Sequence, residues 1–299
     1  MTASGLAGPA RLREGAEELA GGLPPLLAAA EQLAAAVRMG EHGRRRAGMG
    51  DEFWQYRPAH AGDSGRAIDW RRSARADVHF VREKEWQAAQ SVALWVDGAR
   101  SMSFSGRSGR PTKGERARIV ALALAVLLIR AGERVGLSGA GLPPRGGRPQ
   151  LDRLAARLAG DGDEGDYGAP EVASIPPHAR AVFLSDFLGD PSAVEAALVS
   201  AADRGVKGVL LQVLDPDEVA FPFAGRTLFQ SMGGGVVHET RKADDLRDRY
   251  QQRLLERQDR ISALARRTGW LFGRHVTDGP AVGALLWLYQ GLDAKRLQA

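Results

Sequence analysis

Four apolar segments of this chain each lead to an aspartate, and this repeated pattern constrains the fold more than any other feature. The first segment, SVALWV at 91–96, is followed by Asp97 and shows no polar alternation, which is typical of a strand buried on both faces of a parallel sheet. The other three segments end in the same way at Asp186, Asp215 and Asp278. Because the carboxyl ends of parallel strands meet at one edge, we expect the four acids to share that edge.

Helix signals alternate with these segments. Thr112 and Glu115 form a capping box for a helix that continues to about residue 131, and Asp190 followed by proline starts another helix. The segment near 243–268 carries apolar residues at helical spacing. The alternation of strands and helices favours an α/β fold with a doubly wound, mostly parallel sheet.

The first 90 residues differ in composition from the rest. Residues 1–50 indicate an N-terminal helical segment and a glycine-rich basic linker, and the second helix opens at Pro24-Pro25 with an apolar stripe. That stripe packs either on the globular domain or against a partner helix. Residues 51–90 indicate extended segments and turns rich in arginine and aromatic side chains. We therefore predict three parts, 1–50, 51–90 and an α/β domain at 91–299.

The composition excludes several classes of protein. The chain has 299 residues, 44% of them hydrophobic, and no cysteine. A disulfide framework, a thiolate zinc site and a cysteine nucleophile are therefore excluded. The longest apolar run, 119–129, is shorter than the roughly 20 residues that a membrane span requires, and residues 1–10 lack the features of a signal peptide. We expect a protein with no membrane span, located in the cytoplasm.

Basic and aromatic side chains gather between residues 42 and 82. This segment holds nine arginines against five acids, with phenylalanine, tyrosine and tryptophan interleaved. Such a composition is typical of surfaces that bind single-stranded nucleic acid. In the alternative interpretation the arginines pair with neighbouring acids in an internal network, because arginine and carboxylate form bidentate pairs. The pairs would join Arg66, Arg72 and Arg75 to Asp63 and Asp69.

The loop after the first strand resembles the metal-binding loop of von Willebrand factor A-like domains, whose signature is D-x-S-x-S. Asp97 and Ser101 match the signature, whereas Ala99 takes the place of its first serine. By this resemblance Asp97, Ser101 and Asp186 would be ligands of Mg²⁺, an ion that prefers oxygen ligands. Water would replace the missing hydroxyl of this degenerate site. In the alternative, the site is vestigial and these residues only hold the loop.

A block of residues ahead of that strand carries a more specific resemblance. It is similar to a block found in the bacterial domain-of-unknown-function 58 family, and it falls on Gly62, Asp63, Arg66, Ile68, Asp69, Trp70, Ser73, Ala74 and Arg75. The resemblance covers roughly residues 40 to 290. Proteins of this kind are associated with MoxR-type AAA+ ATPases. The resemblance thus implies an adaptor that binds such an ATPase and a client protein during maturation or remodelling.

No set of catalytic residues is complete in the sequence. The segment GAGLPPRGG lacks the spacing of a dinucleotide-binding loop, and SGRPTKGE lacks that of a phosphate-binding loop; we interpret both as turns. The six histidines form no metal-binding pair. Ala99 stands where an aspartyl-phosphate enzyme usually has its second acid. We predict that the protein is not an enzyme, and a metal-assisted hydrolase is the third hypothesis.

The leading hypothesis is therefore a protein-binding module. Its docking surface would include the loop after the first strand, and tryptophan and arginine are the residue types that dominate interface energetics. The candidate partner-binding residues are Asp69, Trp70, Arg72, Arg75 and Arg100. The second hypothesis is nucleic-acid binding through the 42–82 surface, whose signature is strong salt dependence.

Overall fold

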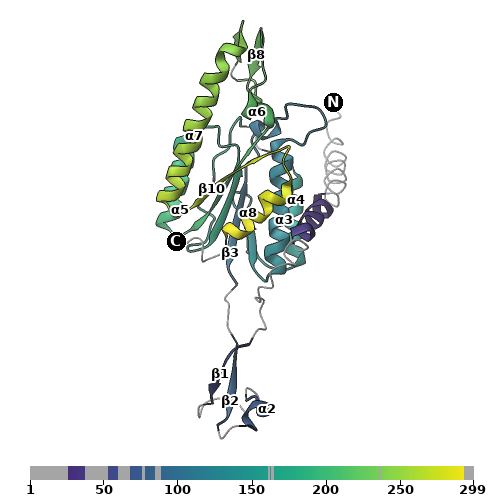
Figure 1. Cartoon of the computed structure of the whole chain (residues 1–299), viewed down its shortest axis with the longest axis vertical. Helices are drawn as coiled ribbons and strands as arrows, with labels where there is room; N and C mark the ends of the chain where they lie inside the picture. Colours follow the sequence, from purple (N-terminus) through teal and green to yellow (C-terminus); the bar gives the residue numbers. More distant parts are fainter. Residues whose placement is uncertain are drawn as a thin grey trace, which may run out of the picture. The chain divides into compact units, whose positions relative to one another are not determined.

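A computed structural model of the chain describes residues 26–37, 53–59, 68–75, 78–84, 89–160, 162, 165–235 and 237–292 (Figure 1). The chain divides into two compact units. The larger unit comprises residues 1–40 together with 90–299, and the smaller unit comprises residues 41–89.

The larger unit is built on a six-stranded sheet with the strand order β10-β7-β6-β3-β4-β5. Its parallel strands are β3 (Ser91–Val96), β4 (Arg134–Leu137), β6 (Arg180–Ser185), β7 (Lys207–Leu214) and β10 (Leu271–Val276). The first of these strands in the chain, β3, lies inside the sheet, and later strands add on both of its sides. This order confirms the predicted doubly wound α/β fold.

One face of the sheet is covered by helices that share a single core. These are α3 (Lys113–Arg130), α4 (Arg148–Ala159), α8 (Ala281–Gly291) and the helix at residues 26–37, drawn in purple in Figure 1. The predicted capping box starts α3, since Thr112 Oγ1 accepts from Glu115 N at 3.1 Å and Glu115 Oε2 accepts from Thr112 N at 2.8 Å. Leu27 and Ala34 of the N-terminal helix are buried in this core. Its apolar stripe thus packs on the α/β unit.

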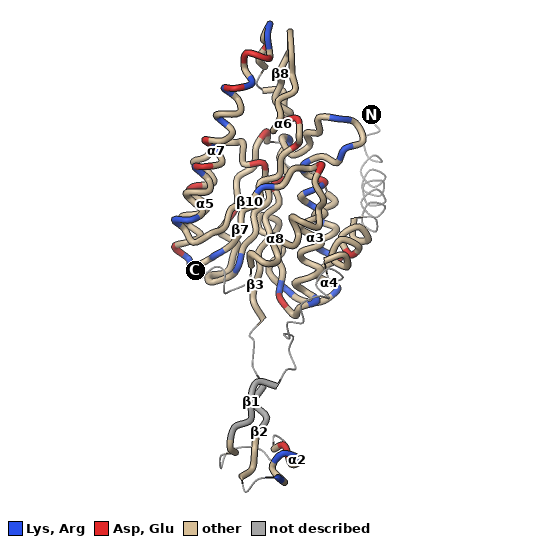
Figure 2. Tube along the Cα trace, in the orientation of Figure 1, with Lys and Arg blue, Asp and Glu red and all other residues tan. Residues whose placement is uncertain are grey.

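The opposite face is covered by α5 (Pro191–Asp203) and α7 (Arg247–Arg267). Three large aromatic rings fill the layer beneath these helices: Phe183 lies 5.9 Å from Trp95 and 4.9 Å from Trp270, measured between ring centroids. The Trp270 indole also donates to the Val206 carbonyl at 3.1 Å. The outer side of α7 carries basic and acidic residues along its length (Figure 2).

One edge strand of the larger unit differs from the prediction. The segment predicted as a turn, GAGLPPRGG, contains the edge strand β5 (Leu142–Arg145), which pairs antiparallel with β4. An edge strand tolerates its two prolines because one side needs no backbone donors. Gly136 permits the close approach, since a Cβ there would lie 2.6 Å from the Leu142 carbonyl oxygen.

Beyond β7 the chain forms a second group of short elements. These are α6 (Pro216–Ala220), the hairpin of β8 (Thr227–Gln230) and β9 (Val237–Thr240), and a short 3-10 helix, η3 (Ala243–Leu246). Among the described residues, no helix is long and apolar enough to cross a membrane.

The smaller unit contains an antiparallel pair, β1 (Phe53–Pro58) and β2 (Phe80–Lys84), and one short helix, α2 (Trp70–Ser73). Asp69 caps this helix, because its Oδ1 accepts from Arg72 N at 3.1 Å. The Ser73 hydroxyl donates to the Asp69 carbonyl at 2.8 Å and accepts from Phe80 N at 2.9 Å. These bonds fix α2 to the start of β2.

Candidate functional site

The four predicted acids follow β3, β6, β7 and β10, so all of them lie at the carboxyl edge of the parallel sheet. Asp97, Asp186 and Asp215 are at most 3% exposed, whereas Asp278 is exposed. A buried carboxylate is costly unless it is paired or hydrogen-bonded. The contacts of these side chains therefore determine what the edge can do.

The Asp97 carboxylate is engaged by its own surroundings. Its Oδ1 accepts from Ala99 N at 2.9 Å, and its Oδ2 accepts from Ser185 Oγ at 2.6 Å. Burial raises the pKa of Asp97, and these hydrogen bonds act in the opposite direction. A Cβ at Gly168 would lie 2.3 Å from Oδ1, so only glycine fits there. The Asp97 side chain thus links the end of β3 to the end of β6 and to the loop that follows β3.

Lys113, the first residue of α3, places a positive charge among the strand-end acids. Its Nζ donates to Asp186 Oδ2 at 2.7 Å and to Glu218 Oε1 at 2.6 Å, and its side chain is 1% exposed. Burial acts to lower the pKa of Lys113, but the two carboxylates outweigh it and the pKa is raised. The amine is therefore an ammonium ion that neutralises part of the edge.

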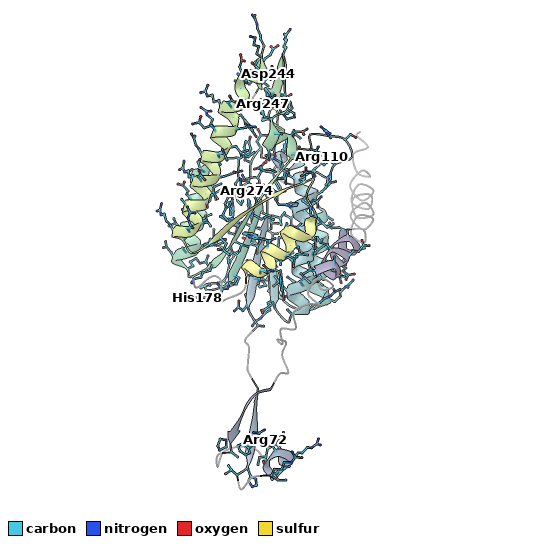
Figure 3. All side chains as sticks on the ribbon, viewed as in Figure 1. Arg72, Arg110, His178, Asp244, Arg247 and Arg274 are labelled. Atoms are coloured by element: carbon cyan, nitrogen blue, oxygen red, sulfur yellow. The ribbon has the colours of Figure 1, made fainter. Side chains whose placement is uncertain are left out.

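Two further cations contact neighbouring strand ends, one just before α3 and one in its first turn. Arg110 Nη1 lies 2.8 Å from Asp215 Oδ1, at the end of the sheet where α6 follows β7 (Figure 3). Arg116 Nη2 donates to the Thr277 carbonyl after β10 at 2.7 Å. The sequence analysis missed these three cations. Their spacing, with Arg110, Lys113 and Arg116 three residues apart around a capping box, was the signal that could have revealed them.

The arrangement of donors at the predicted metal site does not fit a divalent cation. The structure brings Asp97, Ser101 and Asp186 to one edge, but both Asp97 oxygens are engaged, and Asp186 accepts from Leu188 N at 3.0 Å and from the Lys113 ammonium. Of these three side chains, only Ser101 has an oxygen without a hydrogen-bond partner among the described residues. Within the residues that the structure describes, no group of three His, Cys, Asp or Glu side chains is arranged to hold a metal. The ammonium supplies the positive charge that Mg²⁺ would bring.

The loop that follows Asp97 is covered by a segment that the sequence analysis did not identify. The loop forms a short 3-10 helix, η2 (Arg100–Ser103). Its Arg100 N donates to the Gly165 carbonyl and its Ser101 N to the Asp166 carbonyl, both at 2.9 Å. Ser101 is thereby buried, whereas Arg100 is exposed to solvent.

A cavity of about 200 Å³, here called the edge cavity, lies against these groups. Its polar lining consists of Ser101, Lys113, Asp166, Asp186, Gln230, Ser231 and Glu218. Its aromatic lining comes from Phe104, Tyr167, Phe221, Phe223, Phe229 and Tyr250. Asp186 follows β6, Lys113 begins α3, Glu218 belongs to α6, and Asp166 lies in the segment that covers η2. Most of the aromatic rings come from the elements after β7. None of these rings belonged to the predicted site.

The candidate residues of the smaller unit gather on and around α2. Trp70 is 58% exposed, and its ring meets that of His79 edge-on at 5.4 Å between centroids. The Arg72 guanidinium lies 5.4 Å from the centre of the Phe80 ring. Arg75 is exposed beside them. Two members of the predicted arginine network, Asp63 and Arg66, lie outside the described residues.

These features define a class of protein: a doubly wound α/β domain whose strand edge is closed by ion pairs and adjoins an aromatic cavity. The chain belongs to the family described as "Protein of unknown function DUF58", whose model matches residues 55–260.

Similar proteins have been recorded in mycobacteria and Bacteroides. Uncharacterized proteins of Mycobacterium bovis and Mycobacterium tuberculosis are 29% identical over 249 residues, covering 78% of this chain and 77% of theirs. A solved structure of the conserved hypothetical protein BatB from Bacteroides thetaiotaomicron is 15% identical, with a TM-score of 0.42, covering 71% of this chain and all of the other. An aerotolerance-related membrane protein from Bacteroides fragilis is 17% identical, with a TM-score of 0.41, covering 68% of this chain and 98% of the other.

Proposed function

We propose that this protein is a cytoplasmic, non-enzymatic adaptor of the von Willebrand A-like type. Its degenerate metal site would serve as a docking edge for a MoxR-type AAA+ ATPase that matures or remodels a client protein. The observation that carries the proposal is the Lys113 ammonium, which contacts Asp186 and Glu218 within 2.7 Å. A carboxylate committed to a buried ion pair is a poor general base or nucleophile. The buried ion pair therefore supports a rigid sheet edge that holds neighbouring groups for docking, rather than a catalytic site.

Exposed groups in each of the two units support a docking role. Arg100 projects from the loop whose neighbours Ala99 and Ser101 are buried, so its backbone is held while its side chain is exposed. Within the smaller unit Trp70 is 58% exposed, and its side chain is thus available as an interface anchor. Exposed arginine and tryptophan on fixed backbone are the residue types that interfaces use most strongly.

The proposal is tested by recovering partners from native cells on the full chain. We expect the wild-type protein to recover an AAA+ ATPase and Arg100→Ala to recover about tenfold less, which corresponds to about 1.4 kcal/mol of lost contact energy. Arg153→Ala is the matched control, because Arg153 is exposed on α4. Both variants should keep the wild-type melting temperature, since exposed arginines add little to stability.

Trp70→Ala provides an independent test in the smaller unit. Reduced recovery with an unchanged melting temperature would support Trp70 as an anchor. If Arg100→Ala and Trp70→Ala both recover the ATPase at the wild-type level, the docking surface lies elsewhere. If the wild-type chain recovers no AAA+ ATPase at all, the proposed partner is wrong.

A further inference from the structure

The edge cavity contains more acidic than basic groups. Its lining includes three carboxylates, Asp166, Asp186 and Glu218, and a single cation, Lys113. The Lys113 ammonium is already shared between Asp186 and Glu218. The surrounding charge also affects Tyr250, whose pKa is raised by burial and then by Glu218 and Asp186. The potential within the cavity is therefore negative, and it favours a positively charged occupant.

Two buried oxygen atoms beside the cavity have no hydrogen-bond partner among the described residues. They are Ser101 Oγ, on a side chain that is 7% exposed, and Asp166 Oδ1; both residues line the cavity, and both atoms are enclosed by their surroundings. The other oxygen of Asp166 accepts from Ser231 Oγ at 2.9 Å. A buried carboxylate oxygen without a donor is costly, and buried polar atoms are normally paired. These two oxygens thus lack a hydrogen-bond donor among the described residues, and a donor that carries positive charge suits the Asp166 carboxylate best.

The remaining wall suits the apolar part of a long side chain. Phe229 lies 5.6 Å from Phe221 and 5.3 Å from Phe223 between ring centroids, and Tyr250 lies 4.8 Å from Phe221. Lysine and arginine bury their methylene stems on apolar surfaces, and their cationic ends are attracted to ring faces. At about 200 Å³ the cavity is smaller than the roughly 300 Å³ at which typical small-molecule sites begin.

We propose that the edge cavity binds the ammonium or guanidinium group of a lysine or arginine side chain presented by a protein partner. The Asp166 carboxylate accepts an N–H from the incoming group, the Ser101 hydroxyl orients beside it, and the phenylalanine rings enclose the stem. This inference rests on the proposed function, because it names the group that the docking partner presents. It specifies a basic partner residue.

The recognition chemistry is tested with small probes on the full chain. We expect n-butylammonium to bind at least tenfold more tightly than neutral 1-butanol in a calorimetric or NMR titration. Asp166→Asn, which removes the charge at constant shape, should abolish most of that preference, and Ser101→Ala should weaken it. Asp259→Asn is the matched control, because Asp259 is an exposed aspartate on α7. Near-ultraviolet circular dichroism verifies that each variant keeps the native fold.

Two results would overturn the recognition chemistry. Equal binding of n-butylammonium and 1-butanol would show that the cavity does not select a cation and is filled by water. Tighter binding of butyrate than of n-butylammonium would show that Lys113 recognises an anion there.

The source of the cation is tested by partner recovery. We expect Asp166→Asn and saturating n-butylammonium each to reduce recovery of the AAA+ ATPase by about tenfold. If the probe binds but neither treatment changes the recovery, the cavity serves a free amine and the partner side chain is excluded. If the ATPase is recovered through Arg100 while no amine binds, the adaptor proposal stands and the cavity inference fails.

Discussion

Lys113 is the residue that most changes what this sheet edge can do. Mg²⁺ requires about six oxygen ligands in near-octahedral geometry, whereas an ammonium ion needs only two or three acceptors. Asp186 and Glu218 supply two such acceptors at 2.7 and 2.6 Å. Lys113 is the first residue of α3. The capped start of that helix therefore fixes the position of the Lys113 Cα and Cβ atoms.

Replacing Lys113 by methionine should be strongly destabilising. The variant keeps the length of the side chain but leaves Asp186 and Glu218 unpaired in a buried place, and breaking a buried pair in this way costs about 3–5 kcal/mol. Urea denaturation at pH 7 measures the loss. The deficit should shrink as the pH falls towards 4, because burial raises the pKa of Glu218 and lets this carboxyl group bind a proton in the folded state.

Divalent cations provide the contrasting measurement. Wild-type protein should melt at the same temperature with and without 10 mM Mg²⁺, whereas Lys113→Ala should be stabilised by Mn²⁺ or Mg²⁺ because its freed carboxylates become available. A rise of about 2–4 °C for the wild type in Mg²⁺, lost in Asp97→Ala, would show that the predicted ligands do bind the metal.

At this scale the sequence predicted the acids but not their partners. Asp97, Asp186, Asp215 and Asp278 could be placed because each follows an apolar run, which is a local signal. Lys113 could not be assigned to Asp186, because the two residues are 73 positions apart and only the fold brings them together. The edge cavity was missed because most of its aromatic wall comes from loops and short elements without periodicity, which only the fold brings beside Lys113 and Asp186.

At the scale of elements, β10 carries a histidine that makes stability depend on pH. His275 is 8% exposed, and its Nε2 has no partner among the described residues. Its pKa is lowered to about 4 by burial and by Arg116 of α3, with Asp278 acting in the opposite direction. The imidazole is therefore neutral in the folded protein at pH 7.

His275 should make the protein less stable in mild acid. As the pH falls below 6.5, the unfolded chain binds a proton at this residue while the folded chain does not until about pH 4, so the free energy of unfolding decreases across that window. We expect a contribution of about 2 kcal/mol, allowing for solvent screening. The measurement is the difference in denaturation free energy between wild type and His275→Gln from pH 7 to 4. A constant difference would contradict the assignment.

The elements also show which signals in the sequence are local. The capping box of α3 and the Asp190 cap of α5, whose Oδ1 accepts from Ser192 N at 2.9 Å, were predicted because they depend on a few adjacent residues. The strand β5 was not predicted, since its consecutive prolines normally end a strand. It forms only because Gly136 lets it approach β4 closely at the sheet edge.

At the scale of the whole molecule, the alternation of elements predicted the fold class, but the packing of the N-terminal helix stayed open. An apolar stripe shows that a helix needs a partner surface and does not say which one. Ala30, Ala34 and Val37 pack in the core of the larger unit, so the predicted division at residue 50 separates a helix from the domain it completes.

The smaller unit provides a test between protein docking and nucleic-acid binding. Its helix α2 exposes Arg71 and Arg72 beside Trp70, and Arg75 is exposed just after the helix. We expect no measurable binding of the full chain to a single-stranded DNA at 150 mM salt, because the docking proposal assigns these side chains to a protein. Binding that weakens steeply with salt, and whose salt slope drops by about one for each arginine replaced by alanine, would favour nucleic acid instead.

The strand-edge contacts also determine when during folding a docking surface exists. Lys113 meets Glu218 across 105 positions, Asp97 meets Ser185 across 88, and Arg116 reaches the Thr277 carbonyl across 161. No early portion of the chain can form this edge alone, and it is complete only when β10 has joined the sheet. A partner that binds there therefore recognises finished molecules and ignores incomplete ones, so that docking itself reports the quality of the fold.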